Sequence, residues 1–276
     1  MRHPGLKVRM AVSGVVLFAF YAGLVTVLEP LADLPILVGL TLLFVAGQYK
    51  FGKWMAVRSV GGEEFPREEY PEIAAEFDRL CAEMGVEDTK LLIGQMGVPN
   101  AFAVGRKGAG VVVVSDTLLE LLETDELAGV LAHELAHVKN RDSIVMLLGQ
   151  SVATLVSMFV FFVIALADDS IVGSLIGWVL SIIVNAVVMI FVLAISRYRE
   201  YVADDDAAAY TDDPEALARA LVKINEVGHH EQAPDVDDRV GALCIFGGKR
   251  GLLSILFATH PPMEKRVAKL APQLLG

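Results

Sequence analysis

Long apolar runs dominate the hydrophobicity pattern of this chain. Four stretches hold no charged side chain: about Met10 to Leu28, Leu34 to Gly47, Ile144 to Ala167 and Ile171 to Ser196. The first, third and fourth reach the ~20 residues that a helix needs to cross the hydrocarbon layer of a membrane, whereas the second needs flanking residues. We therefore predict four transmembrane helices. No small-residue cleavage pattern precedes Glu29, so the first stretch is expected to stay as an anchor and not to be removed as a signal peptide.

Lysine and arginine lie on one side of these stretches. They precede the first and third and follow the second and fourth, at Arg2, Lys7, Arg9, Lys50, Lys53, Arg58, Lys139, Arg141, Arg197 and Arg199. The connector inside each hairpin carries only acidic charges, as at Asp33 and Asp168. Positive residues mark the cytoplasmic ends of spans. We therefore predict a multi-pass plasma-membrane protein whose two termini and non-membrane regions are cytoplasmic.

The same pattern divides the chain into four segments. Residues 1–50 and 144–196 are the two predicted transmembrane hairpins, and residues 51–143 and 197–276 are two parts of one domain outside the membrane. A hairpin crosses the bilayer twice and returns the chain to its starting side. The two parts can therefore fold together, although the second hairpin separates them in sequence.

Short apolar runs between turn residues predict a small β-sheet in the first of these parts. The runs are about Leu91 to Ile93, Asn100 to Val104 and Val111 to Val114, and a Gly-Arg-Lys-Gly turn at 105–108 joins the last two. Helical patterns predominate elsewhere. The predicted fold is thus mainly α, of the α+β class, with four transmembrane helices and a cytoplasmic domain that contains a small sheet.

Four helices of this domain have recognisable starts, because a capping residue or a proline favours the first helical turn. The predicted helices open at Tyr70-Pro71, Thr124, Asp213-Pro214 and Pro261-Pro262 and run to about Met84, His137, Val227 and Leu270. The helix that opens at Thr124 carries two acidic residues in its first turn, where the helix dipole favours negative charge.

Composition narrows the class of protein. Hydrophobic residues make up 54% of the 276, and the formal net charge is −11. The chain is too apolar for an ordinary soluble domain and fits membrane helices with a globular part. The negative charge argues against nucleic acid as a partner, because phosphates need basic surfaces. The two cysteines, Cys81 and Cys244, show no C-x-x-C spacing and are expected to be buried free thiols.

Residues 131–137, Leu-Ala-His-Glu-Leu-Ala-His, contain the pattern H-E-x-x-H among good helix formers. On a helix, His133 and His137 lie one turn apart and about 40° apart around the axis, so both imidazoles can reach one metal ion. Glu134 lies beside that face, where it can serve as a general base without being a ligand. A five-residue pattern also occurs by chance, so an ordinary helix is the alternative interpretation.

A catalytic zinc site needs a third protein ligand. Glu200 and Asp204 directly follow the fourth apolar stretch and share one helical face through their i, i+4 spacing. Two predicted spans separate Glu200 from His137, and this even number allows its carboxylate to reach the zinc. The spacing alone leaves open that Glu200 is a solvated helix-end carboxylate. Asp204 would suit a hydrogen-bond partner for the non-ligating nitrogen of a zinc histidine.

With these residues in place, the chain resembles the HtpX family of membrane zinc metalloproteases, relatives of the CAAX prenyl proteases. The resemblance rests on four motifs, at Pro99 to Ala103, His133 to Asp142, Ser196 to Asp204, and Thr259 to Pro262 with Arg266. Together with the predicted spans, it covers nearly the whole chain. It implies a zincin-like cytoplasmic domain of the gluzincin type.

The resemblance also implies roles for single residues. It implies one Zn²⁺ per chain, held by His133, His137 and Glu200, with Asp204 as the partner of a ligand. The four residues Asn100, Ala101, Phe102 and Ala103 are implied to form the edge strand along which an extended substrate lies. His260 and Arg266 become candidates to stabilise the oxyanion that develops on the scissile carbonyl.

These residues predict a zinc-dependent endopeptidase with Glu134 as its general base. By resemblance, its substrates are misfolded or damaged membrane proteins, cut on the cytoplasmic side in a stress-response pathway of protein quality control. One alternative is a CAAX-type prenyl peptide protease, although that branch has more spans. The other alternative is a non-catalytic membrane zinc protein, such as a sensor, carrier or scaffold, which leaves the glutamate between the histidines unexplained. No oligomeric state is indicated.

Overall fold

The structure is a computed structural model that describes residues 15, 22, 33–230 and 260–275. The first predicted span, apart from Val15 and Ala22, and Cys244 lie outside the described residues. The chain divides into two compact units. Described residues 33–50 and 145–196 belong to the first, here termed the membrane unit. The remaining described residues from Phe51 onward belong to the second, here termed the globular unit.

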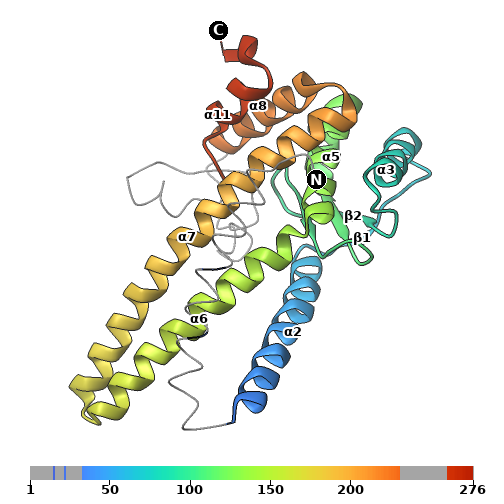
Figure 1. Cartoon of the computed structure of the whole chain (residues 1–276). Helices are drawn as coiled ribbons and strands as arrows, with labels where there is room; N and C mark the ends of the chain where they lie inside the picture. Colours follow the sequence, from blue (N-terminus) through green and yellow to red (C-terminus); the bar gives the residue numbers. More distant parts are fainter. Residues whose placement is uncertain (1–14, 16–21, 23–32, 231–259, 276) are drawn as a thin grey trace. The chain divides into compact units, whose positions relative to one another are not determined.

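Among the described residues, three long helices carry the second, third and fourth apolar stretches (Figure 1). Helix α2 spans Leu34–Ser59, α6 spans Asp142–Ala167, and α7 spans Ile171–Thr211. Helices α6 and α7 are long and apolar enough to cross a membrane. Large apolar side chains on them are exposed, Leu166 by 80% and Ile171 by 89%, as lipid-facing side chains would be.

Small residues bring α6 and α7 close together inside the membrane unit. A Cβ atom added to Gly149 would lie 2.9 Å from the side chain of Val192, so the two helices approach closely at this point. Asn185 donates a hydrogen bond from Nδ2 to Ser157 Oγ at 3.4 Å, which links the two helices through polar groups. Helix α2 is linked to α6 by a hydrogen bond from Ser151 Oγ to Gln48 Oε1, at 2.7 Å.

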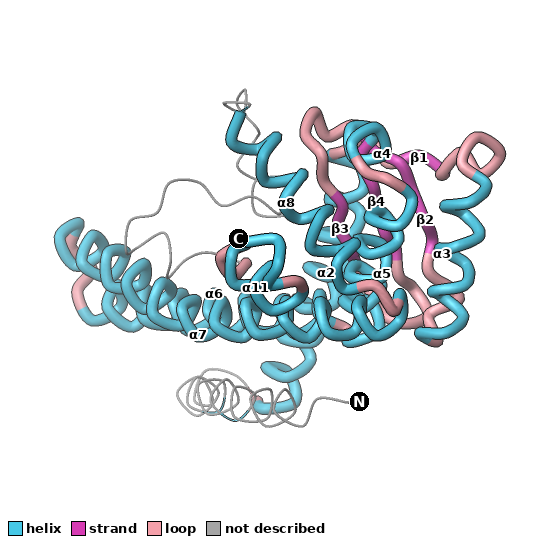
Figure 2. Tube along the Cα trace, turned by 90° about the horizontal axis from the view of Figure 1, so that it is seen from above, coloured by secondary structure: helices cyan, strands magenta, loops and turns pink. Residues whose placement is uncertain are grey.

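The globular unit contains a mixed four-stranded sheet in the order β1-β2-β4-β3 (Figure 2). Its strands are β1 (Glu63–Glu64), β2 (Lys90–Gly94), β3 (Ala101–Val104) and β4 (Val111–Ser115). Strands β2 and β4 are parallel, and the other two pairs are antiparallel. The three predicted strands are confirmed, whereas β1 was not predicted. Strand β3 lies at one edge of the sheet.

Helices make up most of the rest of the globular unit, and three of the four predicted helix starts are confirmed. They are α3 (Pro71–Met84), α4 (Asp116–Leu121), α5 (Thr124–Asn140), α8 (Pro214–His230), α11 (Met263–Leu270) and the 3₁₀ turn η1 (Pro272–Leu275). Thr124 was predicted to cap α5, but it is already helical, and Glu123 is the capping residue. The reason is that the Glu126 side chain accepts a hydrogen bond from the Glu123 backbone N–H at 3.0 Å, which closes the helix one residue earlier.

Helix α5 lies at the centre of the globular unit. It packs against α3 and α8 and against strands β3 and β4. Leu131 and Leu135 are fully buried, and burial of a leucine side chain stabilises the fold by about 1.5–3 kcal/mol. Gly129 allows α8 to approach, because a Cβ added there would lie 3.1 Å from backbone atoms of Leu217. The helix that carries H-E-x-x-H is therefore held firmly on several sides.

Candidate metal centre

Two histidines and a glutamate converge on one point in the globular unit. The Nε2 atoms of His133 and His137 lie 3.2 Å apart, Glu200 Oε2 lies 3.5 Å from His133 Nε2, and Glu200 Oε1 lies 3.5 Å from His137 Nε2. Ligand atoms of a tetrahedral zinc ion with bonds of 2.0–2.1 Å are separated by about 3.3–3.4 Å. The three side chains therefore have the spacing that a single zinc ion requires.

Helical geometry positions all three groups. Helix α5 holds His133 and His137 one turn apart, with ring centroids separated by 4.8 Å and planes at 88°. Helix α7 does not end with its apolar stretch but continues to Thr211, and so carries Glu200 to the histidines. The continuation predicted beyond Ser196 is therefore present, with Glu200 and Asp204 on one face of it.

Asp204 holds the first histidine from behind. Its Oδ1 lies 3.0 Å from His133 Nδ1, and its side chain is fully buried. Arg266 donates two hydrogen bonds to the same carboxylate, at 2.6 and 2.9 Å. This two-pronged pair fixes the orientation of Asp204 and compensates its buried charge.

Asp142 holds the second histidine in the same way, a role that was not predicted. Its Oδ2 lies 2.7 Å from His137 Nδ1, and its other oxygen pairs with the buried Arg199. Arg199 also donates to the Asn140 carbonyl at 2.9 Å. Helix α5 ends in a left-handed turn at Arg141, with φ of 60°, which turns the following aspartate back toward the histidine. The usable signal in the sequence was an acidic residue five positions after His137.

These contacts fix which ring nitrogens face the centre. Carboxylates only accept hydrogen bonds, so in the neutral imidazoles of His133 and His137 the Nδ1 atoms carry the protons, and each Nε2 presents a lone pair. Two lone pairs and the Glu200 carboxylate then face one another at 3.2–3.5 Å. Such a group of acceptors repels itself unless a cation lies among them. Two imidazoles and one carboxylate form a donor set that zinc prefers, so the residues fit this metal.

Buried acids and bases surround the centre. Glu134 is only 5% exposed, and this burial raises the pKa of its carboxyl group. For the metal-free protein, burial opposes protonation of His133, but hydrogen bonds to Asp204 and Glu200 raise its pKa to about 9. A proton therefore competes with a metal ion for this histidine.

The other predicted site residues lie near the centre or on the adjoining strand. His260 Nδ1 lies 2.9 Å from Glu200 Oε2, and its side chain is 24% exposed. Arg266 also lies 3.4 Å from Glu200 but is nearly fully buried. Asn100 is buried just before β3, where its N–H donates to Ser115 Oγ at 2.9 Å. Strand β3 itself, Ala101–Val104, packs against α5.

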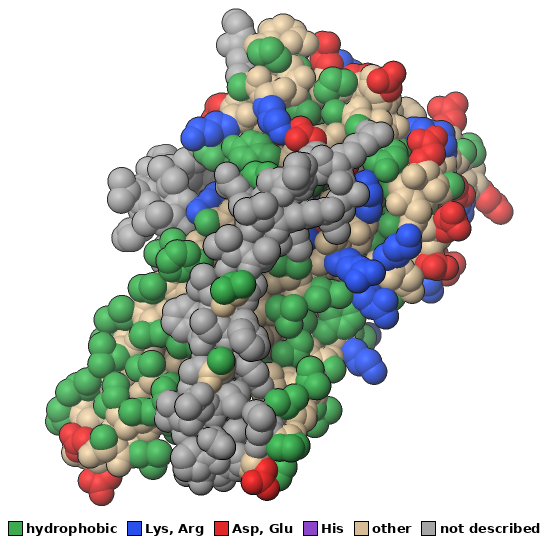
Figure 3. Space-filling model, in the orientation of Figure 1, with side chains coloured by type: hydrophobic (Ala, Val, Ile, Leu, Met, Phe, Trp, Pro, Cys, Tyr) green, Lys and Arg blue, Asp and Glu red, His purple; other side chains and the backbone are tan. Residues whose placement is uncertain are grey.

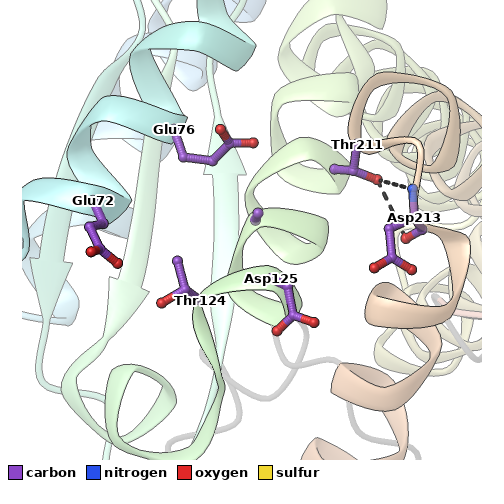
Figure 4. A pocket seen from close by; sticks show the side chains of 7 residues that line it. Glu72, Glu76, Thr124, Asp125, Thr211 and Asp213 are labelled. Carbon is purple, nitrogen blue, oxygen red and sulfur yellow. Dashed lines mark hydrogen bonds between the residues drawn. The ribbon is translucent and has the colours of Figure 1, made fainter.

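A separate acidic cavity of about 420 Å³ contains none of these residues (Figure 4). It is lined by Glu72, Glu76, Thr124, Asp125, Ala128, Thr211 and Asp213. Three of its four carboxylates have structural partners: Glu76 pairs with Arg79, and Asp125 pairs with Arg219. Asp213 Oδ1 accepts the Ala216 N–H at 2.9 Å and so caps α8. These contacts account for three acidic side chains, and the fourth, Glu72, lies in the first turn of α3, where the helix dipole favours negative charge.

Comparisons with known proteins agree with this arrangement. The sequence profile of Peptidase family M48 matches residues 67–273. A Protease HtpX homolog of Halobacterium salinarum is 41% identical over 95% of this chain and 99% of its own length. Protease HtpX homolog 2 of Methanosarcina mazei is 34% identical over 98% of this chain and 95% of its own. The crystal structure of S. mikatae Ste24p matches with a TM-score of 0.60 and 19% identity, over 98% of this chain and 65% of that chain, and supports the fold alone.

Fold, site and relatives together define a membrane metalloprotease. The chain belongs to peptidase family M48, among the HtpX-type proteases. The predicted family is thereby confirmed, as is the mainly helical fold with a small mixed sheet.

Proposed function

We propose that this chain is a zinc-dependent endopeptidase with a gluzincin-type centre, in which His133, His137 and Glu200 hold one Zn²⁺. One observation carries the proposal: the Nε2 atoms of His133 and His137 on α5 and the carboxylate of Glu200 on α7 lie 3.2–3.5 Å from one another. A non-catalytic zinc protein would share these ligands. It would have no use for Glu134, a buried acid adjacent to both of the histidines.

Glu134 is proposed as the general base. A zinc ion bound by the three ligands would supply Lewis-acid chemistry, which lowers the pKa of water and polarises a peptide carbonyl. Glu134 accepts the proton of the attacking water and returns it to the departing amine. Its burial supports this role, because a carboxyl group with a raised pKa holds a proton more readily between the two steps.

The surrounding residues are proposed to position the ligands and the substrate carbonyl. Asp204 and Asp142 hold the two histidines in one tautomer and orientation. His260, which is partly exposed, is proposed to donate to the developing oxyanion. The sequence predicted that Arg266 stabilises the oxyanion. Its hydrogen bonds to Asp204 support a second role, in which it positions Asp204 against His133.

An extended peptide substrate is proposed to pair with β3. This strand lies at an edge of the sheet and packs on the zinc-binding helix, so a strand added there would run beside the centre. Asn100, Ala101, Phe102 and Ala103 would then present the backbone groups that bind it. The proposed substrates are misfolded or damaged membrane proteins, since the protease is itself held in the membrane.

The proposed topology has four spans and a cytoplasmic centre. Helices α6 and α7 are long and apolar enough to cross a membrane, and α2 carries a further apolar stretch. Two hairpins would place residues 51–143 and 197–276 on one side of the membrane. Labelling of single cysteines introduced near Gly62 and Asp168 tests this, because only the second should react from outside.

Two variants test the catalytic proposal. Glu134→Gln should keep stoichiometric zinc and lose peptide cleavage, whereas Glu200→Gln should lose zinc and cleavage together. Glu120→Gln, an exposed acid on α4, is the matched control and should cleave as wild type does. Zinc is measured by metal analysis of the purified chain, and cleavage is measured on an unfolded membrane-protein substrate. Full cleavage by Glu134→Gln would reject the base, and full zinc in Glu200→Gln would reject the third ligand.

A further inference from the structure

Basic side chains from three separate segments meet on the globular unit, although the chain as a whole is strongly acidic. Lys53 belongs to the end of α2, Lys90 to the start of β2, and Arg106 to the turn between β3 and β4. Only the first flanks an apolar stretch. Figure 3 shows lysine and arginine side chains, in blue, gathered over the end of α2 and the neighbouring strands β1 and β2. The fold, and not sequence proximity, assembles this group.

Hydrogen bonds to two backbone carbonyl groups explain how the three residues come together. Lys53 donates from Nζ to the Ala109 carbonyl at 2.7 Å, which ties α2 to the turn that carries Arg106. The Lys90 N–H donates to the Gly110 carbonyl at 3.1 Å, so β2 begins beside the same turn. Two glycines with positive φ, Gly105 and Gly108, shape this turn.

These cations have no acidic partners in the part of the chain that the structure describes. Lys90 and Arg106 are exposed, and none of the three forms an ion pair with a described carboxylate. Partial burial lowers the pKa of Lys53, and the charges of Lys90 and Arg106 lower it further. The cations therefore repel one another, and an anion placed over them would relieve the repulsion.

Two exposed aromatic rings lie on the same part of α2 as Lys53, on another side of the helix. Phe51 and Trp54 are 57% and 56% exposed, and their ring centroids lie 5.8 Å apart. The guanidinium of Arg58 lies 5.6 Å from the Trp54 ring centroid. In the same helix, exposed apolar side chains such as Leu43 lie about two turns before these rings. Aromatic and basic residues at the end of an apolar helix are typical of the headgroup layer of a membrane.

We propose that six residues surround the end of α2 and bind anionic lipid headgroups there: Phe51, Lys53, Trp54, Arg58, Lys90 and Arg106. The name basic-aromatic patch is used for this set. The aromatic rings of the patch would lie at the level of the lipid ester groups, and its cations would contact the lipid phosphates. Anionic lipids should therefore be enriched next to the patch. The proposal does not depend on zinc or on proteolysis.

The two tryptophans of the chain provide a direct test. Trp178 lies on α7 in the membrane unit, so a Trp178→Phe variant leaves Trp54, within the patch, as the sole tryptophan. This full-length variant is reconstituted in phosphatidylcholine vesicles that contain a fixed fraction of phosphatidylglycerol. Trp54 fluorescence is compared when the same nitroxide quencher is carried by the phosphatidylglycerol or by the phosphatidylcholine. Stronger quenching by labelled phosphatidylglycerol at equal mole fraction is expected.

Charge reversal of Arg106 tests the assignment to the patch. Arg106 is exposed and donates only within its own turn, to the Lys107 carbonyl, so Arg106→Glu should not disturb folding. One basic residue close to an anionic membrane changes the affinity for anionic lipid by about fivefold. Charge reversal of Arg106 should therefore remove most of the preference of this site for phosphatidylglycerol. Lys265→Glu, an exposed reversal on α11, is the matched control and should retain it. Molar salt should weaken the preference.

Two results would overturn the proposal. One is equal quenching of Trp54 by the two labelled lipids. The other is a preference for phosphatidylglycerol that Arg106→Glu and Lys265→Glu leave equally intact. Zinc content and thermal unfolding of each variant show that it is folded, so a lost preference cannot be attributed to lost structure.

Discussion

His137 and Asp142 are joined by a 2.7 Å hydrogen bond between Nδ1 and a carboxylate oxygen, across the end of the zinc-binding helix. The bond makes Nδ1 the protonated nitrogen and leaves Nε2 free to bind a metal. Arg199 pairs with the other oxygen of Asp142 and holds the carboxylate in place. The second histidine of the centre therefore depends on a residue outside H-E-x-x-H.

Asp142→Asn should weaken zinc binding by about 10- to 100-fold, because an amide can donate to Nδ1 and favour the wrong tautomer. The dissociation constant is measured by competition with a chelator. Asp205→Asn is the matched control, since Asp205 is an exposed neighbour of Asp204 whose carboxylate pairs with Lys269. Equal zinc affinity of Asp142→Asn and wild type would contradict the role given to Asp142.

Local patterns were sufficient to predict most elements of the fold. A run of four consecutive valines between turn residues predicted β4, and Asp213-Pro214 predicted the start of α8. Strand β1 could not be predicted, because Glu63 and Glu64 have no apolar pattern and become a strand only by pairing with β2. The cap of α5 was misplaced by one residue because a glutamate, not the adjacent threonine, closes the helix.

The candidate site could be predicted only where helix geometry carries the information. The pairing of His133 with His137, and of Glu200 with Asp204, follows from one turn of helix. The Asp142 contact depends on a left-handed residue, Arg141, that no sequence pattern indicated. Contacts between distant segments, such as the basic-aromatic patch, arise from packing and become visible only in the folded chain.

Replacement of Arg266 should destabilise the globular unit. Arg266→Met leaves the Asp204 carboxylate buried without its cation, and loss of one partner of a buried pair costs about 3–5 kcal/mol. Arg266→Lys keeps the charge but loses the two-pronged contact, and should have an intermediate effect. Arg67→Met breaks an exposed pair with Asp78 and should cost less than about 1 kcal/mol. Thermal unfolding of the zinc-loaded variants measures these losses of stability. If Arg67→Met lost as much stability as Arg266→Met, the role given to the buried pair would be refuted.

Gly129→Val tests the close contact between α5 and α8. Additional atoms at Gly129 meet the backbone of Leu217, so the substitution should cost about 1–3 kcal/mol and weaken zinc binding as α5 shifts. Gly52→Val places the same side chain in α2, where a Cβ meets no neighbour within 4 Å, and serves as the control. Unfolding midpoints and zinc affinities of the two variants are compared. If Gly129→Val and Gly52→Val had the same unfolding midpoint and zinc affinity, the close contact between α5 and α8 would be unimportant for stability and for zinc binding.

Cys81 should behave as a protected thiol. It is buried on α3 at 3% exposure, and this burial raises the pKa of its thiol to about 12. In a Cys244→Ser chain at pH 8, alkylation of Cys81 should therefore be slow until the protein unfolds. A Ser59→Cys variant that lacks both native cysteines has an exposed thiol and should react rapidly.

The same pKa shift of Cys81 predicts a dependence of stability on pH. The folded chain keeps the thiol proton at a pH where the unfolded chain has released it. The contribution of Cys81 is thus constant below the ordinary thiol pKa and falls as pH rises from there toward 12. Denaturant unfolding at pH 8 and pH 10 should show a larger loss of stability for the parent chain than for Cys81→Ala. An identical loss in both would mean that the thiol is accessible to water in the folded state.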